Sequence, residues 1–228
     1  MAAARRLADH VAEARAHNNL AHAHIRLGHL DDAHTQLQQA LELYRRAGDR
    51  TGQAHIHLVL AEVREQQGRP ADGLDHSQRA LELYRASGYR YGQAYALNNV
   101  GWFHALLGDH EQALTHCQQA LTLHREHADT DGQASTWLSL GYAHQHLGHH
   151  AEAVTSYQHA IDLTRDRYYE ADTLARLGDT HHAADNPDAA RTAWQQALDI
   201  LDDLDHPDAE RVRAKLDRLD RPTNPHPR

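Results

Sequence analysis

The chain has 228 residues, is 40% hydrophobic and 24% charged, and carries a formal net charge of -9 at pH 7. This charge disfavours non-specific binding to nucleic acid phosphates, and the single cysteine, Cys117, excludes an internal disulfide framework and suits a reducing compartment. No apolar run reaches the roughly 18 residues of a membrane span. We therefore expect a cytoplasmic protein with no direct nucleic acid binding and no membrane association.

Common Ala, Leu, Gln, Arg and Glu, with scarce Val, Ile and Phe, favour an all-α fold. The tripeptide Gly-Gln-Ala recurs at residues 52–54, 92–94 and 132–134. When the chain is divided at this period, each row holds a small residue, a breaker seven residues later, a second small residue, and an alanine. The rows begin at Ala12, Gly52, Gly92, Gly132 and Tyr169.

Each row predicts a helix–turn–helix hairpin. The first helix ends at the breaker, where glycine suits a left-handed C-terminal cap, and Pro70 and Pro187 suit the first turn of a second helix. The small residues predict close approach of the two helices. The expected breakers are Gly28, Gly68, Gly108, Gly148 and Asp185, and the expected small residues on the first helices are Ala21, Ala61, Gly101, Gly141 and Gly178.

In chain order, residues 1–11 match the end of a preceding second helix, because "RRLADH" aligns with "RRAGDR". This predicts that the chain is a fragment of a longer array. Five hairpins follow, then an amphipathic capping helix over 205–220 with Pro207 in its first turn, and a disordered tail over 221–228. The hairpins are expected at 12–51, 52–91, 92–131, 132–168 and 169–204.

These columns resemble the tetratricopeptide repeat over residues 12–204. The marks are Trp137 in "STWLSLGYAH" and the pairs Leu140-Gly141 and Leu177-Gly178. The period of 40 departs from the usual ~34 residues, and arginines stand where a proline normally closes the second helix. The longer form is similar to repeats of kinesin light chain, of Leu-Gly-Asn scaffolds, and of C-terminal arrays in bacterial multidomain transcriptional regulators of the antibiotic regulatory protein (STAND ATPase) type. The resemblance implies a right-handed superhelical solenoid.

The histidines and the cysteine do not predict chemistry. Of the 23 histidines, His24, His104, His144 and His181 share one column. Equivalent atoms in stacked repeats lie roughly 10 Å apart, too far for shared metal coordination. Cys117 shares a column expected to face the hairpin interior. No phosphate loop, catalytic pair or metal spacing appears, so we expect no enzyme, no cofactor and no metal site.

The resemblance implies that first helices line a concave groove, and the candidate binding residues lie there. Trp102 has no expected role in the framework, and Asn18 and Asn98 resemble groove asparagines whose amides hold an extended peptide. The alternative is that the asparagines are merely solvated and Trp102 packs on a neighbouring helix. The candidates are Asn18, His22, Arg26, Leu58, Glu62, Tyr95, Asn98, Trp102, Leu138 and Tyr142.

We therefore expect a peptide- or protein-binding scaffold, the sensor or interaction region of a bacterial transcriptional regulator, whose partner is a peptide, a protein or another domain of the same polypeptide. One alternative is a sensor of a small molecule or signalling peptide that changes shape on binding. A second is a self-association module. An enclosed apolar pocket around Trp102 would favour the first alternative.

Overall fold

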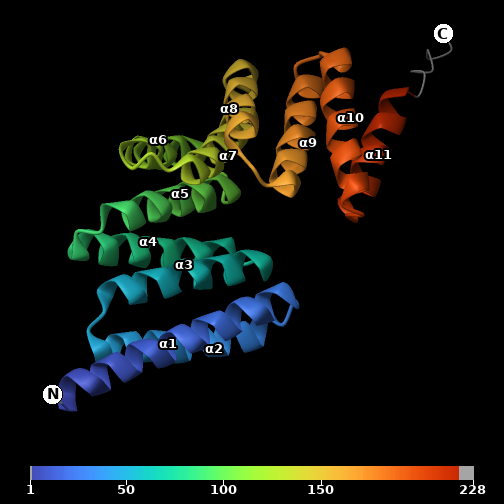
Figure 1. Cartoon of the computed structure of the whole chain (residues 1–228). Helices are drawn as coiled ribbons and strands as arrows, with labels where there is room; N and C mark the ends of the chain where they lie inside the picture. The colour runs from blue at the N-terminus through green and yellow to red at the C-terminus, as the bar shows by residue number, and fades with distance from the viewer. Residues whose placement is uncertain (1, 221–228) are drawn as a thin grey trace, which may run out of the picture. The chain divides into compact units, whose positions relative to one another are not determined.

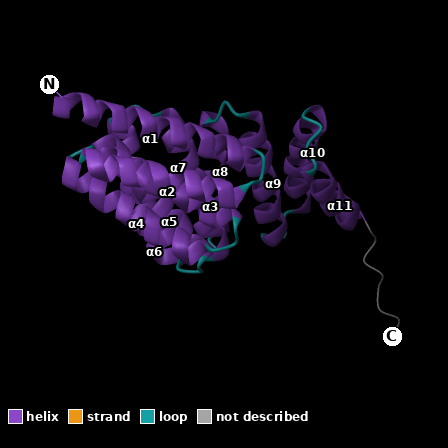
Figure 2. Cartoon of the chain, turned by 90° about the horizontal axis from the view of Figure 1, so that it is seen from below, coloured by secondary structure: helices purple, strands orange, loops and turns teal. Residues whose placement is uncertain are grey.

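The computed structural model describes residues 2–220, which consist of helices joined by short loops, with no strand in that range (Figures 1 and 2). The all-α prediction is confirmed. The helices are α1 (Ala2–Arg26), α2 (Leu30–Ala47), α3 (Arg50–Gln66), α4 (Pro70–Ser87), α5 (Arg90–Leu106), α6 (His110–Glu126), α7 (Thr130–His146), α8 (His150–Leu163), α9 (Arg167–Ala183), α10 (Pro187–Asp203) and α11 (Asp208–Asp220).

The chain divides into two compact units, Met1–His127 and Ala128–Arg228. The first holds the hairpins α1/α2, α3/α4 and α5/α6, with α2 packed on α3 and α4 on α5 (Figure 1). The second holds α7/α8 and α9/α10, with α8 packed on α9 and α11 on α10. Each hairpin thus buries its apolar face against its neighbours in the chain, as expected for a repeat array.

The predicted breakers end the first helices as expected. The backbone is left-handed at Gly28, Gly68, Gly108 and Gly148, with φ between 70° and 90°, and Asp185 takes φ 58° in the last hairpin. Glycine reaches this region without a steric penalty, whereas aspartate is one of the few other residues that tolerate it. Pro70 and Pro187 begin α4 and α10, as predicted.

The start of the first helices differs from the prediction. The second hairpin was expected to begin at Gly52, but α3 begins at Arg50, and Gly52 lies in its first turn, where its N–H donates to the Asp49 side chain at 2.9 Å. A Cβ on Gly52 would lie 2.3 Å from the ring of Tyr44, and one on Gly92 would lie 2.5 Å from the ring of Tyr84. A side chain at either position would therefore clash with the tyrosine of the preceding second helix, which packs directly on the glycine.

The prediction that residues 1–11 form the end of a preceding second helix is wrong for the described residues 2–11. Helix α1 runs unbroken from Ala2 to Arg26, so residues 2–11 extend the first helix of the first hairpin instead of ending a preceding second helix. Within it, Ala14 and Ala21 are buried in the core that also includes Leu37 and Leu41 of α2.

Inside the hairpins, the predicted small column is confirmed as a line of close contact. A Cβ on Gly101 would lie 2.4 Å from Cys117 Sγ, one on Gly141 would lie 2.6 Å from the Tyr157 ring, and one on Gly178 would lie 2.4 Å from the Trp194 ring. Cys117 and Tyr157 are fully buried, in agreement with the column expected to face the interior. In each of these three hairpins, a side chain of the second helix thus fills the space beside the glycine of the first helix.

Helix α11 closes the second unit on α10. Its Ala209, Val212 and Leu216 belong to the same core as α9 and α10, and it begins one residue after Pro207. The only lysine, Lys215, places Nζ at 2.6 and 2.7 Å from the two carboxylate oxygens of Asp179 in α9. The predicted disordered tail at 221–228 lies outside the described residues.

The second hairpin contains a close histidine pair. His57 Nδ1 of α3 and His76 Nδ1 of α4 are 3.0 Å apart, and His57 is 4% exposed. Burial, followed by the neighbouring His76, lowers the pKa of His57 to about 4, and burial, followed by Arg64, lowers the pKa of His76 to about 4. The pair is therefore neutral in the folded protein near neutral pH.

Gly141→Ala is expected to destabilise the protein by about 1–3 kcal/mol, because the added methyl meets the buried Tyr157 ring. In a Tyr157→Leu background the clash is gone, and the same change is expected to be neutral or stabilising by up to about 1 kcal/mol through helix propensity. Urea denaturation of the four proteins measures the coupling. Equal costs in both backgrounds would contradict the packing argument.

The histidine pair is expected to make stability depend on pH. The unfolded histidines titrate at 6.5 and the folded ones at about 4, so the unfolded state binds more protons between these values. The contribution of this pair to the free energy of unfolding is fully present above pH 6.5. It falls on acidification towards pH 4, by at most about 1.4 kcal/mol per pH unit for each histidine. Urea denaturation at about pH 6.5 and 5 should show a smaller loss for His76→Gln than for the wild type. An identical loss in both would count against this assignment.

Candidate binding surfaces

All ten predicted binding residues lie on first helices. Eight are in the first unit and two, Leu138 and Tyr142, are in the second. Arg26 and Glu62 are exposed, and the other eight are half-buried. The prediction that these side chains remain reachable from solvent is therefore compatible with the structure, but their contacts differ from one another.

Trp102 links two first helices in the first unit. Its indole N–H donates to Glu65 Oε1 of α3 at 2.8 Å, and the side chain is half-buried. This corrects the expectation that Trp102 has no role in the framework, because the bond ties α5 to α3. We call the surface of α1, α3 and α5 that carries the predicted residues the first-helix face.

The two predicted asparagines are directed differently from a peptide-binding amide. Asn98 Oδ1 accepts from the Cys117 thiol at 3.8 Å, so this oxygen faces α6 within the hairpin. Asn18 Oδ1 is buried, and no hydrogen-bond partner for it is found in residues 2–220. The carbonyl end of each amide therefore lies against protein, and for Asn98 the NH₂ group is the end left for a ligand.

Tyr95 belongs to an aromatic group that the sequence analysis missed. Its hydroxyl is 3.2 Å from that of Tyr91, and its ring lies edge-on to His124 at 4.8 Å between centroids. Tyr89 is 43% exposed and Tyr91 is 37% exposed. Their spacing at the start of α5 could have revealed the group, because no other row carries tyrosine at the positions of both Tyr91 and Tyr95.

Tyr142 in the second unit makes a contact like that of Trp102. The Arg176 guanidinium of α9 lies 5.5 Å from the centre of its ring and also pairs with Asp172 at 2.8 Å. Burial opposes the charge on Arg176, but the Asp172 carboxylate outweighs it and raises the Arg176 pKa. Trp102 and Tyr142 occupy the same column of the repeat, and each thus contacts an adjacent first helix of its own unit.

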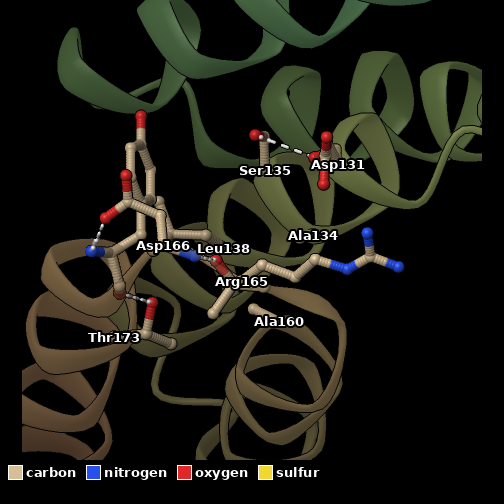
Figure 3. Close-up of a pocket in the computed structure, with 10 residues that line it drawn as sticks. Asp131, Ala134, Ser135, Leu138, Ala160, Arg165, Asp166 and Thr173 are labelled. Atoms are coloured by element: carbon tan, nitrogen blue, oxygen red, sulfur yellow. Dashed lines mark hydrogen bonds between the residues drawn. The ribbon is translucent and has the colours of Figure 1, made fainter.

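Leu138 lines a recess of about 450 Å³ in the second unit. Figure 3 shows Asp131 and Ser135 of α7 on one side and Asp166 and Thr173 on the other. The residues that line it are Asp131, Ala134, Ser135, Leu138, Ala160, Thr164, Arg165, Asp166, Tyr169 and Thr173.

The recess follows from a change in the repeat. Helix α8 has 14 residues, whereas α2 and α4 have 18, and Thr164 stands at the position that Tyr44 and Tyr84 occupy near the ends of α2 and α4. The matching first-turn glycine is replaced by Tyr169. Here the large residue lies on the first helix and the smaller one at the end of the second helix, which reverses the arrangement of Tyr44 and Gly52. The small side chains of Ala134, Ser135 and Ala160 leave space beside Thr164 and Tyr169.

The recess offers both charges to solvent. Asp131 and Arg165 are exposed, and no ion pair between described residues involves either of them. Asp166 is occupied as the N-cap of α9, since its Oδ1 accepts from the backbone N–H groups of Tyr168 and Tyr169 at 2.9 and 3.0 Å. Among the residues that line the recess, only Leu138 was expected from the sequence, although the step from Gly132 to Tyr169 is shorter than the earlier steps and marks the place.

In the described part of the chain, no helix is long and apolar enough to cross a membrane.

The comparisons with solved structures find the same fold. BtubC (BKLC) from P. vanneervenii is 18% identical, with a TM-score of 0.66, and the match covers 100% of this chain and 96% of that one. A signal transduction ATPase with a tetratricopeptide repeat sensor, from Pyrococcus horikoshii, is 18% identical with a TM-score of 0.71, covering 92% of this chain and 33% of that one.

A Rap protein complexed with Competence and Sporulation Factor is 17% identical with a TM-score of 0.66, covering 92% of this chain and 64% of that one. No curated protein sequence matches the chain.

The family models match most of the chain. Two models, both described as tetratricopeptide repeat, match residues 14–47 and the overlapping segments 52–126, 93–166 and 132–203. These segments contain the hairpins described above, and such repeats are scaffolds typical of protein–protein interaction. The chain belongs to the tetratricopeptide repeat family.

Proposed function

We propose that this chain is a non-enzymatic peptide- or protein-binding scaffold that uses the first-helix face. The observation that carries the proposal is the half-buried indole of Trp102, held by Glu65 at 2.8 Å on a surface shared by two first helices. A fixed, half-exposed tryptophan offers a large contact area with little loss of side-chain entropy on binding. Exposed Glu62 and Arg26 add charged groups that can select the partner.

We further propose that the scaffold is the sensor or interaction region of a bacterial transcriptional regulator in the cytoplasm. Support comes from the likeness to an ATPase with a tetratricopeptide repeat sensor, of which this chain spans about a third, and to a Rap protein bound to a signalling factor. The partner would then be a peptide, a protein or another domain of the same polypeptide. The single, buried Cys117 is compatible with a reducing compartment.

A second candidate function is the sensing of a small molecule or signalling peptide. The recess beside Leu138 favours it, because about 450 Å³ is enough to enclose a small ligand or a peptide side chain. Its free Asp131 and Arg165 would suit a ligand that carries both charges. Self-association is the third candidate, and a concentration-dependent mass in light scattering would support it.

The first proposal predicts that Trp102→Ala and Asn98→Ala weaken capture of the partner from the native host by about tenfold or more, as expected for residues worth ~1.4 kcal/mol or above. Pull-down followed by titration with the isolated partner measures the change. Gln119→Ala, an exposed change on α6, is the matched control and should bind like the wild type.

Circular dichroism and thermal melting separate binding from folding. The two variants are expected to keep the wild-type helix content and a melting temperature within a few degrees. If they bind normally, or if Gln119→Ala loses the partner instead, the first-helix face is not the binding surface. If both variants unfold, the contacts of Trp102 with Glu65 and of Asn98 with Cys117 are required for folding, and the proposed site is lost.

A further inference from the structure

The turn between α1 and α2 brings three potential metal ligands together. His24 lies in the last turn of α1, His29 is the N-cap residue of α2, and Asp32 lies in its first turn. One ligand atom from each residue can be chosen so that all three atoms lie within 4.8 Å of one another. Among residues 9–219, whose side chains the structure describes, no other group of three histidine, cysteine or acidic residues meets this condition.

The backbone of the turn fixes this arrangement. Gly28 takes φ 73°, and the His29 N–H donates to the His24 carbonyl at 2.9 Å. This turn brings the two residues close together, and the centroids of their imidazole rings lie 6.0 Å apart. Although His29 occupies the N-cap position, its side chain makes no capping hydrogen bond, so the ring is available to a ligand.

The polar atoms of the group face one another without being satisfied. His24 Nδ1 is buried and has no hydrogen-bond partner in the described part of the chain. It lies 3.9 Å from Asp32 Oδ2, which is too long for a hydrogen bond. A buried nitrogen in this position loses its hydration without a compensating bond. A bound cation between the nitrogen and the carboxylate would satisfy both atoms.

We propose that His24, His29 and Asp32 bind one divalent transition metal ion of the zinc class, with solvent completing the coordination. Two imidazoles and one carboxylate match the ligand preferences of Zn(II), Co(II), Ni(II) and Cu(II), and not those of Mg(II) or Ca(II). Metal–ligand bonds of about 2.0–2.2 Å place ligand atoms about 3.3 Å apart in a tetrahedron. His29 and Asp32 are exposed, so their side chains can rotate to close the remaining distance.

The site differs from the histidine ladder that the sequence analysis rejected. The ladder consists of equivalent histidines in successive hairpins, whereas these three ligands lie in one turn, at spacings of five and three residues. The same positions in the third hairpin carry His104, Asp109 and Gln112. His104 Nδ1 lies 3.4 Å from Asp109 Oδ2, so that turn repeats the pair of groups without a third ligand.

Cobalt titration of the full chain, without a polyhistidine tag, tests the proposal. The wild type is expected to bind one Co(II) saturably, with visible absorption bands that Zn(II) abolishes and Mg(II) leaves unchanged. His29→Ala and Asp32→Asn are each expected to weaken this binding by about tenfold or more. Both residues are exposed, so these variants should fold, and circular dichroism verifies it.

His104→Ala is the matched control for the chain's many other histidines, and His149→Ala controls for the fourth turn, which carries His144, His149 and Glu152. Both controls are expected to retain wild-type Co(II) affinity at the first turn. The proposal is overturned if saturable binding is absent up to about 1 mM metal. It is also overturned if either control weakens the binding as much as His29→Ala does.

Discussion

The close contact between the two helices of a hairpin is the constraint on which this structure depends. Where the second helix carries Tyr157 or Trp194, the first helix carries Gly141 or Gly178, and a Cβ there would lie 2.6 or 2.4 Å from the ring. The large side chain fills the space that the glycine leaves, so the backbones approach without a void. This contact also places Trp194 so that its N–H reaches the Ala175 carbonyl and Asp179, each at 3.1 Å.

The same exchange of size governs the contact from one hairpin to the next. Tyr44 and Tyr84 pack over Gly52 and Gly92, and the recess in the second unit appears where this pair is reversed to Thr164 and Tyr169. A repeat array can therefore gain a cavity through two compensating substitutions and a shorter second helix. The recess beside Leu138 therefore lies where the contact between tyrosine and glycine of successive hairpins is absent.

The sequence predicted the hairpins and their turns well because glycine leaves a direct physical signature. The left-handed turns at Gly28, Gly68, Gly108 and Gly148 were expected from the breaker column alone. The start of α1 was not predicted: Ala8 stands in the column where Gly48 ends α2, yet α1 continues through this position. Alanine does not exclude a turn in this column, because Ala128 takes φ 52° after α6, so the residues of the column alone do not decide where the helix ends.

The candidate site was less predictable, because a repeat column gives a residue's position but not its partners. Asn98 and Trp102 are four residues apart on one helix, yet one faces Cys117 within its own hairpin and the other bonds to Glu65 of the hairpin before it. The turns show the same limit. His24 and His104 share a column, but Gln112 stands where the first turn has Asp32, so only the first of these two turns brings three ligands together. Since the framework residues recur in every row, specific chemistry can arise only where the rows differ, and such differences acquire meaning only when the fold places them beside one another.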